Sequence, residues 1–459
     1  MSKVGKQVWS FLMRLLGKLL FLSLIVSPFL LVGEDVSRPN IVFILGDDQH
    51  WSDYGFMGSK EINTPHLDAL AHRSLSFQRG YVAAPICRPS LASMATGLFP
   101  HQHGITGNDV YKNEDRAKRD IPFREAFHQK PSFIKELVKL GYLAHQSGKW
   151  WEGSYQDGGF THGMTHGDPQ RGGRHGDVGL KIGRNGLKPI TDFVAHAQKE
   201  KKPFLLWYAP FLPHTPHNPP ERLLKKYRKE GRPMDQAKYF AMCEWFDETC
   251  GNLLGFLDKQ GMTDNTLIVF TCDNGWSTPS SNKDDPNQKL WRSYAQRTKG
   301  SPYEGGIRNP VLLSWPAKVK AESSPDLAHS VDLFPTIITA AGGKPPAGLP
   351  GIDLLDANTR SVRKAVYGVT HATHNMTLGH PNDTLQYVWC IRGNCKLIKR
   401  FRGKDVSQYK ALHQWDQDPF HLYHLKNDPE EKEDLVQKHP EIVQEMNAQI
   451  SQWLIDTKG

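Results

Sequence analysis

The residues best suited to chemistry in this chain are two pairs of polar side chains, each directly after a short apolar run. Asp47 and Asp48 follow the first run, and Asp273 and Asn274 follow a later one. Hard divalent cations prefer oxygen ligands, which Asp and Asn side chains supply. A Ca²⁺ or Mg²⁺ site is therefore one hypothesis. The simpler alternative is that these residues cap strand ends and form turns.

Short apolar runs alternate with helical patterns along the chain. The runs at residues 40–46, 204–208 and 266–271 are too short for typical helices and read as strands buried on both faces. Helical patterns at 132–140 and 238–257 lie between them. The alternation predicts an α/β fold with a large, mostly parallel sheet flanked by helices. Ligand sites in such sheets lie beyond the carboxyl ends of the strands, where both polar pairs fall.

A change of composition at residues 342–346 indicates a linker. The elements predicted after it are strands at 365–368, 386–391 and 395–399 and an amphipathic helix at 440–454. We therefore expect a large domain at 38–345 and a smaller C-terminal α+β subdomain at 346–459, which carries an antiparallel sheet. Two stretches between the predicted elements, 153–186 and 277–299, read as long loops, and loops of that length are often functional.

The first 33 residues have the order of a secretory signal peptide. A basic segment precedes an apolar run at residues 19–32, which is short for a membrane span. A membrane anchor and a buried helix are the alternatives. We expect an exported protein, periplasmic, secreted or lumenal, with no stable membrane span after processing.

The composition is that of a soluble globular protein. The chain has 459 residues, 38% hydrophobic and 23% charged, which suffices for one large domain and a smaller one. The formal net charge of +9 favours anionic substrates. No concentrated stripe of Lys and Arg with interleaved aromatic residues is present, so no nucleic-acid partner is expected.

Six cysteines are available for chemistry or bridging. Cys390 and Cys395 flank a turn-like Gly-Asn pair, where a hairpin disulfide and two free thiols are equally open in an exported protein. Cys243 and Cys250 lie two turns apart in a helical pattern, too far along one helix to bridge. We expect these two to be unpaired thiols.

The segment CRPSLASMATG at residues 87–97 resembles the signature of type I sulfatases, a family of the alkaline phosphatase superfamily. Other segments resemble the same family and follow its order along nearly the whole chain. They are NIVFILGDDQ at 40–49, NTPHLDALA at 63–71, GKW at 148–150, PHTP at 213–216, TCDNG at 271–275, KGSPYEGGIR at 299–308 and LYHLKNDPE at 422–430. Each match alone is weak, but the ordered set is specific.

The resemblance implies a sulfuric ester hydrolase in which a maturation enzyme oxidises Cys87 to formylglycine. The implied metal ligands are Asp47, Asp48, the modified Cys87, Asp273 and Asn274, and the metal is Ca²⁺, with Mg²⁺ as the alternative. The implied catalytic and sulfate-binding residues are Lys149, His214 and Lys299, with His214 or Lys299 as the proton donor to the leaving alcohol. The expected substrate is a sulfated carbohydrate or an aryl sulfate.

Two positions depart from the family pattern. Leu91 stands where the family has Arg, and Trp151 stands where it has His. Arg88 is one candidate to replace the missing guanidinium. The candidates to replace the missing imidazole are His162, His166 and His175. Two other functions therefore stay open: a phosphate or phosphonate ester hydrolase of the same superfamily, and a non-catalytic homologue that binds sulfated glycans.

Two further expectations concern local structure. Pro89 is expected in the first turn of a helix that follows Cys87, because proline is tolerated there. The N-terminus of that helix would direct partial positive charge toward the sulfate. The tryptophans expected to stack on sugars are Trp150, Trp151, Trp276 and Trp291.

Overall fold

The computed structural model describes residues 38–110, 116–167, 177–277, 297–372, 376–401 and 418–458. The predicted signal peptide lies outside these ranges, as do His175, Trp291 and parts of both predicted long loops. The chain from Pro39 onward forms one compact unit. Among the described residues, no helix combines the length and apolar character needed to cross a membrane.

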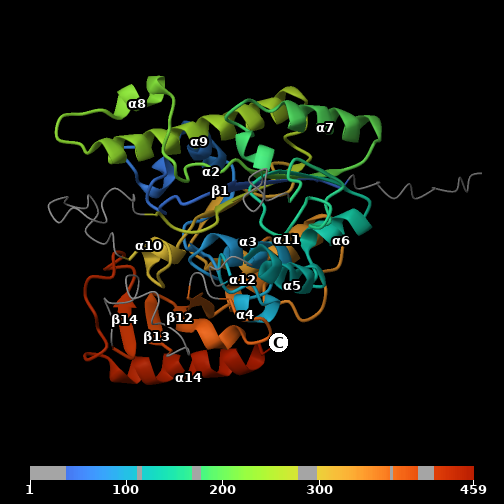
Figure 1. The fold of residues 1–459 in the computed structure, drawn as a ribbon. Coiled ribbons are helices and arrows are strands. Elements are labelled where there is room, and N and C mark those ends of the chain that lie inside the picture. Colours follow the sequence, from blue (N-terminus) through green and yellow to red (C-terminus); the bar gives the residue numbers. More distant parts are fainter. Residues whose placement is uncertain are drawn as a thin grey trace, which may run out of the picture. The chain divides into compact units, whose positions relative to one another are not determined.

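A large sheet lies between two layers of helices (Figure 1). Within the described ranges it has eight strands in the order β5–β4–β6–β1–β7–β8–β2–β9. The bounds are β1 Asn40–Gly46, β2 Leu75–Phe77, β4 Leu143–Gly148, β5 His162–Gly163, β6 Phe204–Ala209, β7 Thr266–Cys272, β8 Val311–Ser314 and β9 Glu322–Ser324. The strands from β5 to β7 are parallel, and β8 is antiparallel to both β7 and β2. The predicted sheet and its three predicted strands are thus confirmed.

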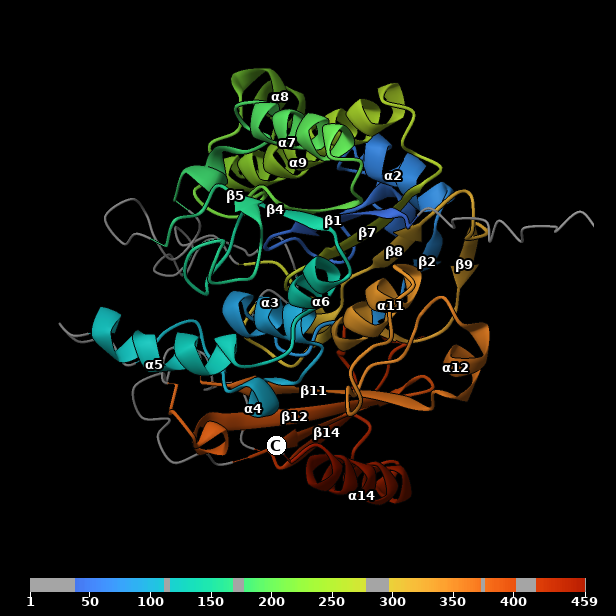
Figure 2. The same ribbon diagram turned by 90° about the vertical axis from the view of Figure 1, so that its right-hand side faces the viewer.

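The side chains of the central strands alternate between two apolar cores, as the pleat of a strand requires. On β1, Phe43 and Leu45 belong to one core, whereas Val42 and Ile44 belong to the other. The second core includes residues of α2 (Pro65–His72), α7 (Lys188–Lys199) and α9 (Met234–Lys259). The first includes residues of α3 (Cys87–Thr96), α5 (Arg116–His128), α6 (Phe133–Lys139) and α11 (Leu333–Ala340). Figure 2 shows these two layers on opposite faces of the sheet. Burial on both faces explains why the predicted strands are continuously apolar.

The remaining elements are short. They are η1 Gly55–Met57, β3 Gly80–Tyr81, α4 Pro100–His103, η4 Asp177–Lys181, α8 Glu221–Tyr227, α10 Glu304–Ile307, β10 Ala328–His329, η6 Ser330–Asp332, α12 Ala357–Val362 and η7 Pro381–Thr384. The helices predicted at residues 132–140 and 238–257 correspond to α6 and α9. Pro89 lies in the first turn of α3, as expected.

The C-terminal part is a four-stranded antiparallel sheet covered by a helix. Its elements are β11 Ala365–His371, β12 Leu385–Arg392, β13 Cys395–Arg400, β14 Phe420–His424 and α14 Pro440–Asp456. Val443, Met446 and Ile450 of α14 belong to the same apolar core as strand residues of this sheet. The predicted antiparallel sheet and terminal helix are confirmed.

The cysteines of the β12–β13 hairpin are not bridged. Cys390 lies opposite Leu397, and Cys395 lies opposite Arg392, so the two cysteines are diagonal rather than paired. Neither cysteine forms a disulfide, and neither do Cys243 and Cys250 on α9. The hairpin-disulfide alternative is therefore wrong, and the absence of a disulfide between the two cysteines of α9 is as expected.

The contribution of the core to stability can be tested at Trp207 on β6. Its ring stacks on Phe43 with centroids 5.0 Å apart and meets Trp150 edge-on at 5.4 Å. Its indole N–H donates to the carbonyl oxygen of Lys149 at 3.0 Å. We expect Trp207→Ala to lower the free energy of unfolding by about 3 to 5 kcal/mol because it leaves a cavity. The control Val362→Ala, at a side chain that is 73% exposed, should change it by less than about 0.5 kcal/mol. Equal midpoints in guanidinium chloride for the two variants would contradict this.

Candidate active site

The parallel strands bring the predicted site residues to one edge of the sheet. Asp47 follows β1, Lys149 follows β4 and Asp273 follows β7. The Asp273 amide donates to the carbonyl of Gly46 on β1 at 3.0 Å, and the Lys149 amide donates to the carbonyl of Ala209 on β6 at 2.7 Å. The carboxyl ends of these strands meet at this edge, as the sequence predicts.

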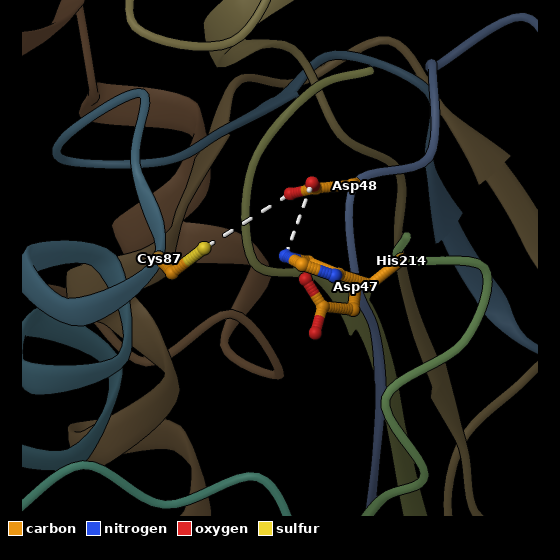
Figure 3. A group of neighbouring side chains, drawn as sticks. All are labelled: Asp47, Asp48, Cys87 and His214. Carbon is orange, nitrogen blue, oxygen red and sulfur yellow. Dashed lines mark hydrogen bonds and ion pairs between the residues drawn. The ribbon is translucent and has the colours of Figure 1, made fainter. Parts of the chain in front are cut away.

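Asp48 is the centre of the cluster. Its backbone has a φ of 63°, a left-handed conformation that Asp tolerates better than most residues. Its amide donates to Asp273 Oδ1 at 3.3 Å, and its Oδ1 accepts from Asn274 Nδ2 at 2.7 Å. Figure 3 shows its carboxylate facing both Cys87 and His214. Burial raises the pKa of Asp48, but Lys299, His214 and Lys149 outweigh that effect and hold it well below its usual range.

Two buried lysines neutralise the carboxylates. Lys149 Nζ lies 2.7 Å from Asp47 Oδ1 and 3.0 Å from Asp273 Oδ2. Lys299 Nζ lies 2.5 Å from Asp48 Oδ1 and 3.0 Å from Cys87 Sγ. Burial lowers the pKa of each lysine, but the neighbouring carboxylates raise it further, so the pKa of each lies above its usual value. Both lysines therefore stay charged at neutral pH.

Cys87 lies at the N-terminus of α3 and points into this cluster (Figure 3). Its Sγ is 4.0 Å from Asp48 Oδ1 in addition to its contact with Lys299. Burial raises the pKa of the Cys87 thiol to about 12, and the lowering effects of Lys149 and Lys299 do not offset this. The thiolate is the reactive form of cysteine, so the unmodified side chain is a poor nucleophile near neutral pH.

His214 lies in the loop after β6 and is stacked on Phe211 with ring centroids 4.1 Å apart. Its Nδ1 lies 2.5 Å from the carbonyl oxygen of Thr215, which only accepts, so Nδ1 carries the proton. Its Nε2 faces Asp48 Oδ2 at 3.5 Å. Burial lowers the pKa of His214 more than Asp48 and Asp47 raise it. When the ring is neutral, Nε2 and Asp48 Oδ2 are therefore two acceptors that face each other. A proton or a metal cation between them would remove this repulsion.

The loop that carries His214 is held by two residues that the sequence did not point to. Phe211 has a φ of 57°, and Lys149 Nζ lies 5.4 Å from the centroid of its ring. Arg184 donates to the Phe211 carbonyl at 2.7 Å and to Asn218 Oδ1 at 3.2 Å. Neither residue belongs to a recognisable motif, and Arg184 is 27 positions before its partner. The sequence gives no sign that the backbone of Phe211 is in the left-handed conformation.

The donor set fits a hard divalent cation. The three carboxylates of Asp47, Asp48 and Asp273 face two ammonium groups, which leaves negative charge for a further cation to balance. In the described part of the chain, Asp47 Oδ2 and Asn274 Oδ1 are buried without a hydrogen-bond partner. Burial, together with the charges of Asp47 and Asp48, raises the pKa of Asp273 to about 7 despite Lys149. Oxygen ligands of this kind suit Ca²⁺ or Mg²⁺.

All eight predicted site residues lie in this one cluster. They are Asp47, Asp48, Cys87, Lys149, His214, Asp273, Asn274 and Lys299. Ligand atoms of Asp47, Asp48, Cys87 and His214 lie within 4.8 Å of one another and form a possible metal-binding group. His214, which the sequence predicts only as a catalytic and sulfate-binding residue, thus lies among the expected metal ligands.

Arg88 does not replace the guanidinium that is missing at Leu91. Its Nε and Nη2 donate to the two carboxylate oxygens of Glu152 at 2.6 and 2.8 Å, and its Nη1 donates to Asp120 at 2.5 Å. Leu91 itself is buried in the apolar core that α3 shares with the sheet. The ion pairs of Arg88 instead connect the first turn of α3 to α5 and to the segment after β4.

Of the three histidines expected to replace the imidazole that is missing at position 151, the two that the structure describes do not lie in the cluster. His162 lies on the edge strand β5, beside Phe193 and His196, and His166 lies beside Tyr155. His175 lies outside the described residues.

The expectation that tryptophans line a sugar site is wrong for the three that the structure describes. The side chains of Trp150, Trp151 and Trp276 are at most 5% exposed. Trp150 contacts Phe160 and Trp207 and so contributes to the core beneath the site. Residue type alone does not distinguish a stacking platform from a core aromatic.

Sequence comparison assigns the family. The profile described as Sulfatase matches residues 39–343, and the profile described as N-sulphoglucosamine sulphohydrolase, C-terminal, matches residues 294–457. The first match covers more than half of the chain. The chain therefore belongs to the sulfatase family, whose members are sulfuric ester hydrolases.

Individual relatives agree with this assignment. N-acetylgalactosamine-6-sulfatase of Canis lupus familiaris is 28% identical over 70% of this chain and 66% of its own length. Human arylsulfatase A is 28% identical over 71% of this chain and 69% of its own length. The crystal structure of Ps i-CgsB, also solved with k-i-k-neocarrahexaose, is 25% identical, covers 92% of this chain and 93% of its own, and has a TM-score of 0.68. The chain thus spans about two thirds of the length of the two curated relatives.

The raised pKa of Cys87 predicts resistance to alkylation. In folded, unmatured protein at pH 8 the thiol is buried and protonated, so iodoacetamide should label it far more slowly than Cys395, which is half-buried. Peptide mass spectrometry after timed quenching measures both rates. Denatured protein, in which both cysteines should react alike, is the control. Labelling of Cys87 as fast as Cys395 in the folded protein would contradict the prediction.

Proposed function

We propose that the protein is an exported sulfatase that hydrolyses sulfate monoesters on carbohydrates through a formylglycine at position 87 and a bound divalent cation. The observation that carries the proposal is the position of Lys299, whose ammonium group contacts both Cys87 Sγ and Asp48 Oδ1. The ammonium group of Lys299 is thus adjacent both to the position of the nucleophile and to the expected metal ligands. Such an arrangement suits an anionic group that bridges the two.

Formylglycine would supply a hydrated aldehyde, one hydroxyl of which is the nucleophile toward sulfur. The pKa of about 12 supports this modification, because the unmodified thiol of Cys87 is not activated. Position 87 is also the first residue of α3, so the N-terminal amides of the helix direct partial positive charge toward an incoming sulfate.

The lysines would bind the sulfate and align it. Lys149 and Lys299 approach the cluster from different loops, so their ammonium groups can hold different oxygens of one sulfuryl group. Neutralising the negative charge of the ester lowers the cost of bringing a nucleophile to sulfur. Because Lys149 is almost fully buried, water screens its charge little.

Of the two candidates, Lys299 is the one that carries a proton at neutral pH. Asp48 raises the pKa of Lys299 and so makes it a weaker acid, but a departing alkoxide is basic enough to take that proton. His214 has a lowered pKa and keeps its proton on Nδ1, directed at Thr215, so its neutral Nε2 has no proton to give. We therefore assign proton transfer to Lys299 and orientation of the substrate to His214.

Asp47, Asp48, Asp273 and Asn274, with the modified residue 87, would hold the cation. When bound, it would act as a Lewis acid that offsets the charge of the sulfuryl oxygens. We propose Ca²⁺, with Mg²⁺ as the alternative, because the family resemblance implies Ca²⁺, whereas the oxygen ligands suit either ion. The unpartnered oxygens of Asp47 and Asn274 support this assignment.

The substrate class and the location rest on the relatives and on the leader. The canine relative is named as a sulfatase of N-acetylgalactosamine 6-sulfate, and Ps i-CgsB was solved with k-i-k-neocarrahexaose. We propose a sulfated carbohydrate substrate for this chain, a catalytic domain at 38–345 and a C-terminal subdomain at 346–459. We also propose export by the signal peptide at residues 1–33, with Cys87 oxidised by a dedicated maturation enzyme.

Activity and maturation can be tested together. Protein coexpressed with a formylglycine-generating enzyme should hydrolyse 4-nitrocatechol sulfate and desulfate sulfated oligosaccharides. Its Cys87 peptide should be lighter by the difference between CH₂SH and CHO. Lys299→Ala should lower kcat by about 100- to 1,000-fold because it removes one charged donor. Lys188→Ala, at a side chain 83% exposed, is the matched control. An unmodified Cys87 in an active protein would refute the formylglycine assignment, and faster cleavage of phosphate than of sulfate esters would favour a phosphohydrolase.

Metal dependence gives a separate test. Chelation should abolish hydrolysis, and Ca²⁺ should restore both the activity and the thermal midpoint, since a ligand that binds only the folded state stabilises it. Asp47→Asn should lower the Ca²⁺ affinity measured by calorimetry, whereas Asp192→Asn, at a side chain 62% exposed, should not. Unchanged Ca²⁺ binding by Asp47→Asn would exclude Asp47 as a ligand.

A further inference from the structure

A buried ionic cluster connects the C-terminal sheet to the segment that carries Lys299. Lys396 on β13 lies 3.2 Å from Glu304 Oε1 on α10 and 2.8 Å from Glu431 Oε1, in the turn after β14. None of the three side chains is more than 1% exposed. The cluster lies outside the catalytic group described above.

The cluster also fixes the backbone of α10. Glu431 Oε2 accepts from the backbone amide of Glu304 at 2.6 Å, which caps the first turn of that short helix. Glu304 Oε2 accepts from the hydroxyl of Tyr81 at 3.2 Å and lies 3.7 Å from Arg308 Nη1. Buried ion pairs of this kind contribute little net stability compared with apolar packing, because desolvation offsets the attraction. Their geometric effect on α10 is the clearer consequence.

A second contact joins the same two segments. The guanidinium of Arg297 lies over the ring of Tyr303 at 4.3 Å and near that of Tyr423 at 5.8 Å. It also donates to the backbone carbonyl of Glu431. Residues 297–308 are thus held by β14 and its following turn at two separate points.

The other side of this segment is bonded to the active site. The Lys299 amide donates to the Trp276 carbonyl at 2.9 Å, and the Gly300 amide donates to that of Pro85 at 2.9 Å. The Gly275 amide donates to the Gly306 carbonyl at 3.0 Å. The segment therefore links the C-terminal turn to the loops that carry Cys87, Asp273 and Asn274. A displacement of α10 would move Lys299 relative to Cys87.

We propose that Lys396 and Glu431 are positioning residues that hold the 297–308 segment so that Lys299 Nζ reaches both Cys87 and Asp48. The inference rests on the proposed function of Lys299. It assigns a role to the C-terminal turn, which the sequence singles out only as a family-like stretch ending at Glu430. Neither Lys396 nor Glu431 contacts the sulfate position in this assignment. Both act through the backbone of α10.

The variant that tests this is Glu431→Gln, which keeps the size of the side chain and removes its charge. The control is Glu433→Gln, which removes an exposed ion pair to Lys438 from the same turn. Glu431→Gln should lower kcat on a sulfate ester by about 10- to 100-fold with little change in KM, as expected for a displacement of about 1 Å. Glu433→Gln should match the unsubstituted protein.

A double-mutant cycle distinguishes positioning from general destabilisation. If Glu431 acts through Lys299, Glu431→Gln should cost little further activity in a Lys299→Ala background. The same fold-loss in both backgrounds would overturn the proposal, as would an unchanged kcat for Glu431→Gln alone. If Glu431→Gln does not fold, Glu431→Asp provides the same cycle, because it keeps the charge beside Lys396 and withdraws the carboxylate from the backbone amide of Glu304.

A readout without turnover separates this inference from the proposed function. Hydrogen–deuterium exchange should be faster in peptides covering residues 297–308 of Glu431→Gln than in those of Glu433→Gln, at matched global stability. Equal exchange would overturn the positioning role even if the protein is an active sulfatase. Conversely, faster exchange in a protein that cleaves no sulfate ester would support the structural link and refute the proposed function.

Discussion

The structure depends on the balance between carboxylates and ammonium groups at the carboxyl edge of the sheet. Asp47, Asp48 and Asp273 are brought together by parallel strands, and without Lys149 and Lys299 their mutual repulsion would oppose that register. The attraction between these charges is strong because water is excluded from the cluster, although desolvation offsets much of its contribution to stability. The same exclusion would strengthen the effect of the lysines on the sulfate that we propose as the bound group, so one constraint bears on both the fold of this edge and its proposed chemistry.

The lysines that balance the charge of these carboxylates come from distant parts of the chain. Lys149 comes from the next strand but one in the sheet, whereas Lys299 comes from a segment that the C-terminal turn holds through Glu431. The C-terminal family profile matches residues 294–457 and therefore includes that segment. This range agrees with the contacts, in which residues 297–308 bond to the C-terminal turn as well as to the active-site loops.

Sequence predicted the parts of this structure that have local or periodic signals. The strand at residues 40–46 was recognisable because burial on both faces makes it continuously apolar, and the eight residues that form the cluster were recognisable from ordered motifs. Phe211, Arg184 and Glu431 were not, because each acts through a backbone contact to a residue remote in sequence. Lys396 reads as an ordinary residue of a strand. The three described tryptophans were misassigned because their ring types suit a core as well as a sugar.

The burial of Cys87 limits when an enzyme could reach its side chain. In the finished fold its side chain is 2% exposed beneath Lys299, and all ten residues of α3 are buried. If Cys87 is oxidised as proposed, an enzyme that needs the extended segment must reach it before α3 docks on the sheet. Residue 87 leaves the ribosome long before residues 299 and 431, so the chain offers such an interval while the elements that close the site are not yet made. Slower folding of the N-terminal half would lengthen that interval, and a more stable α3 would shorten it.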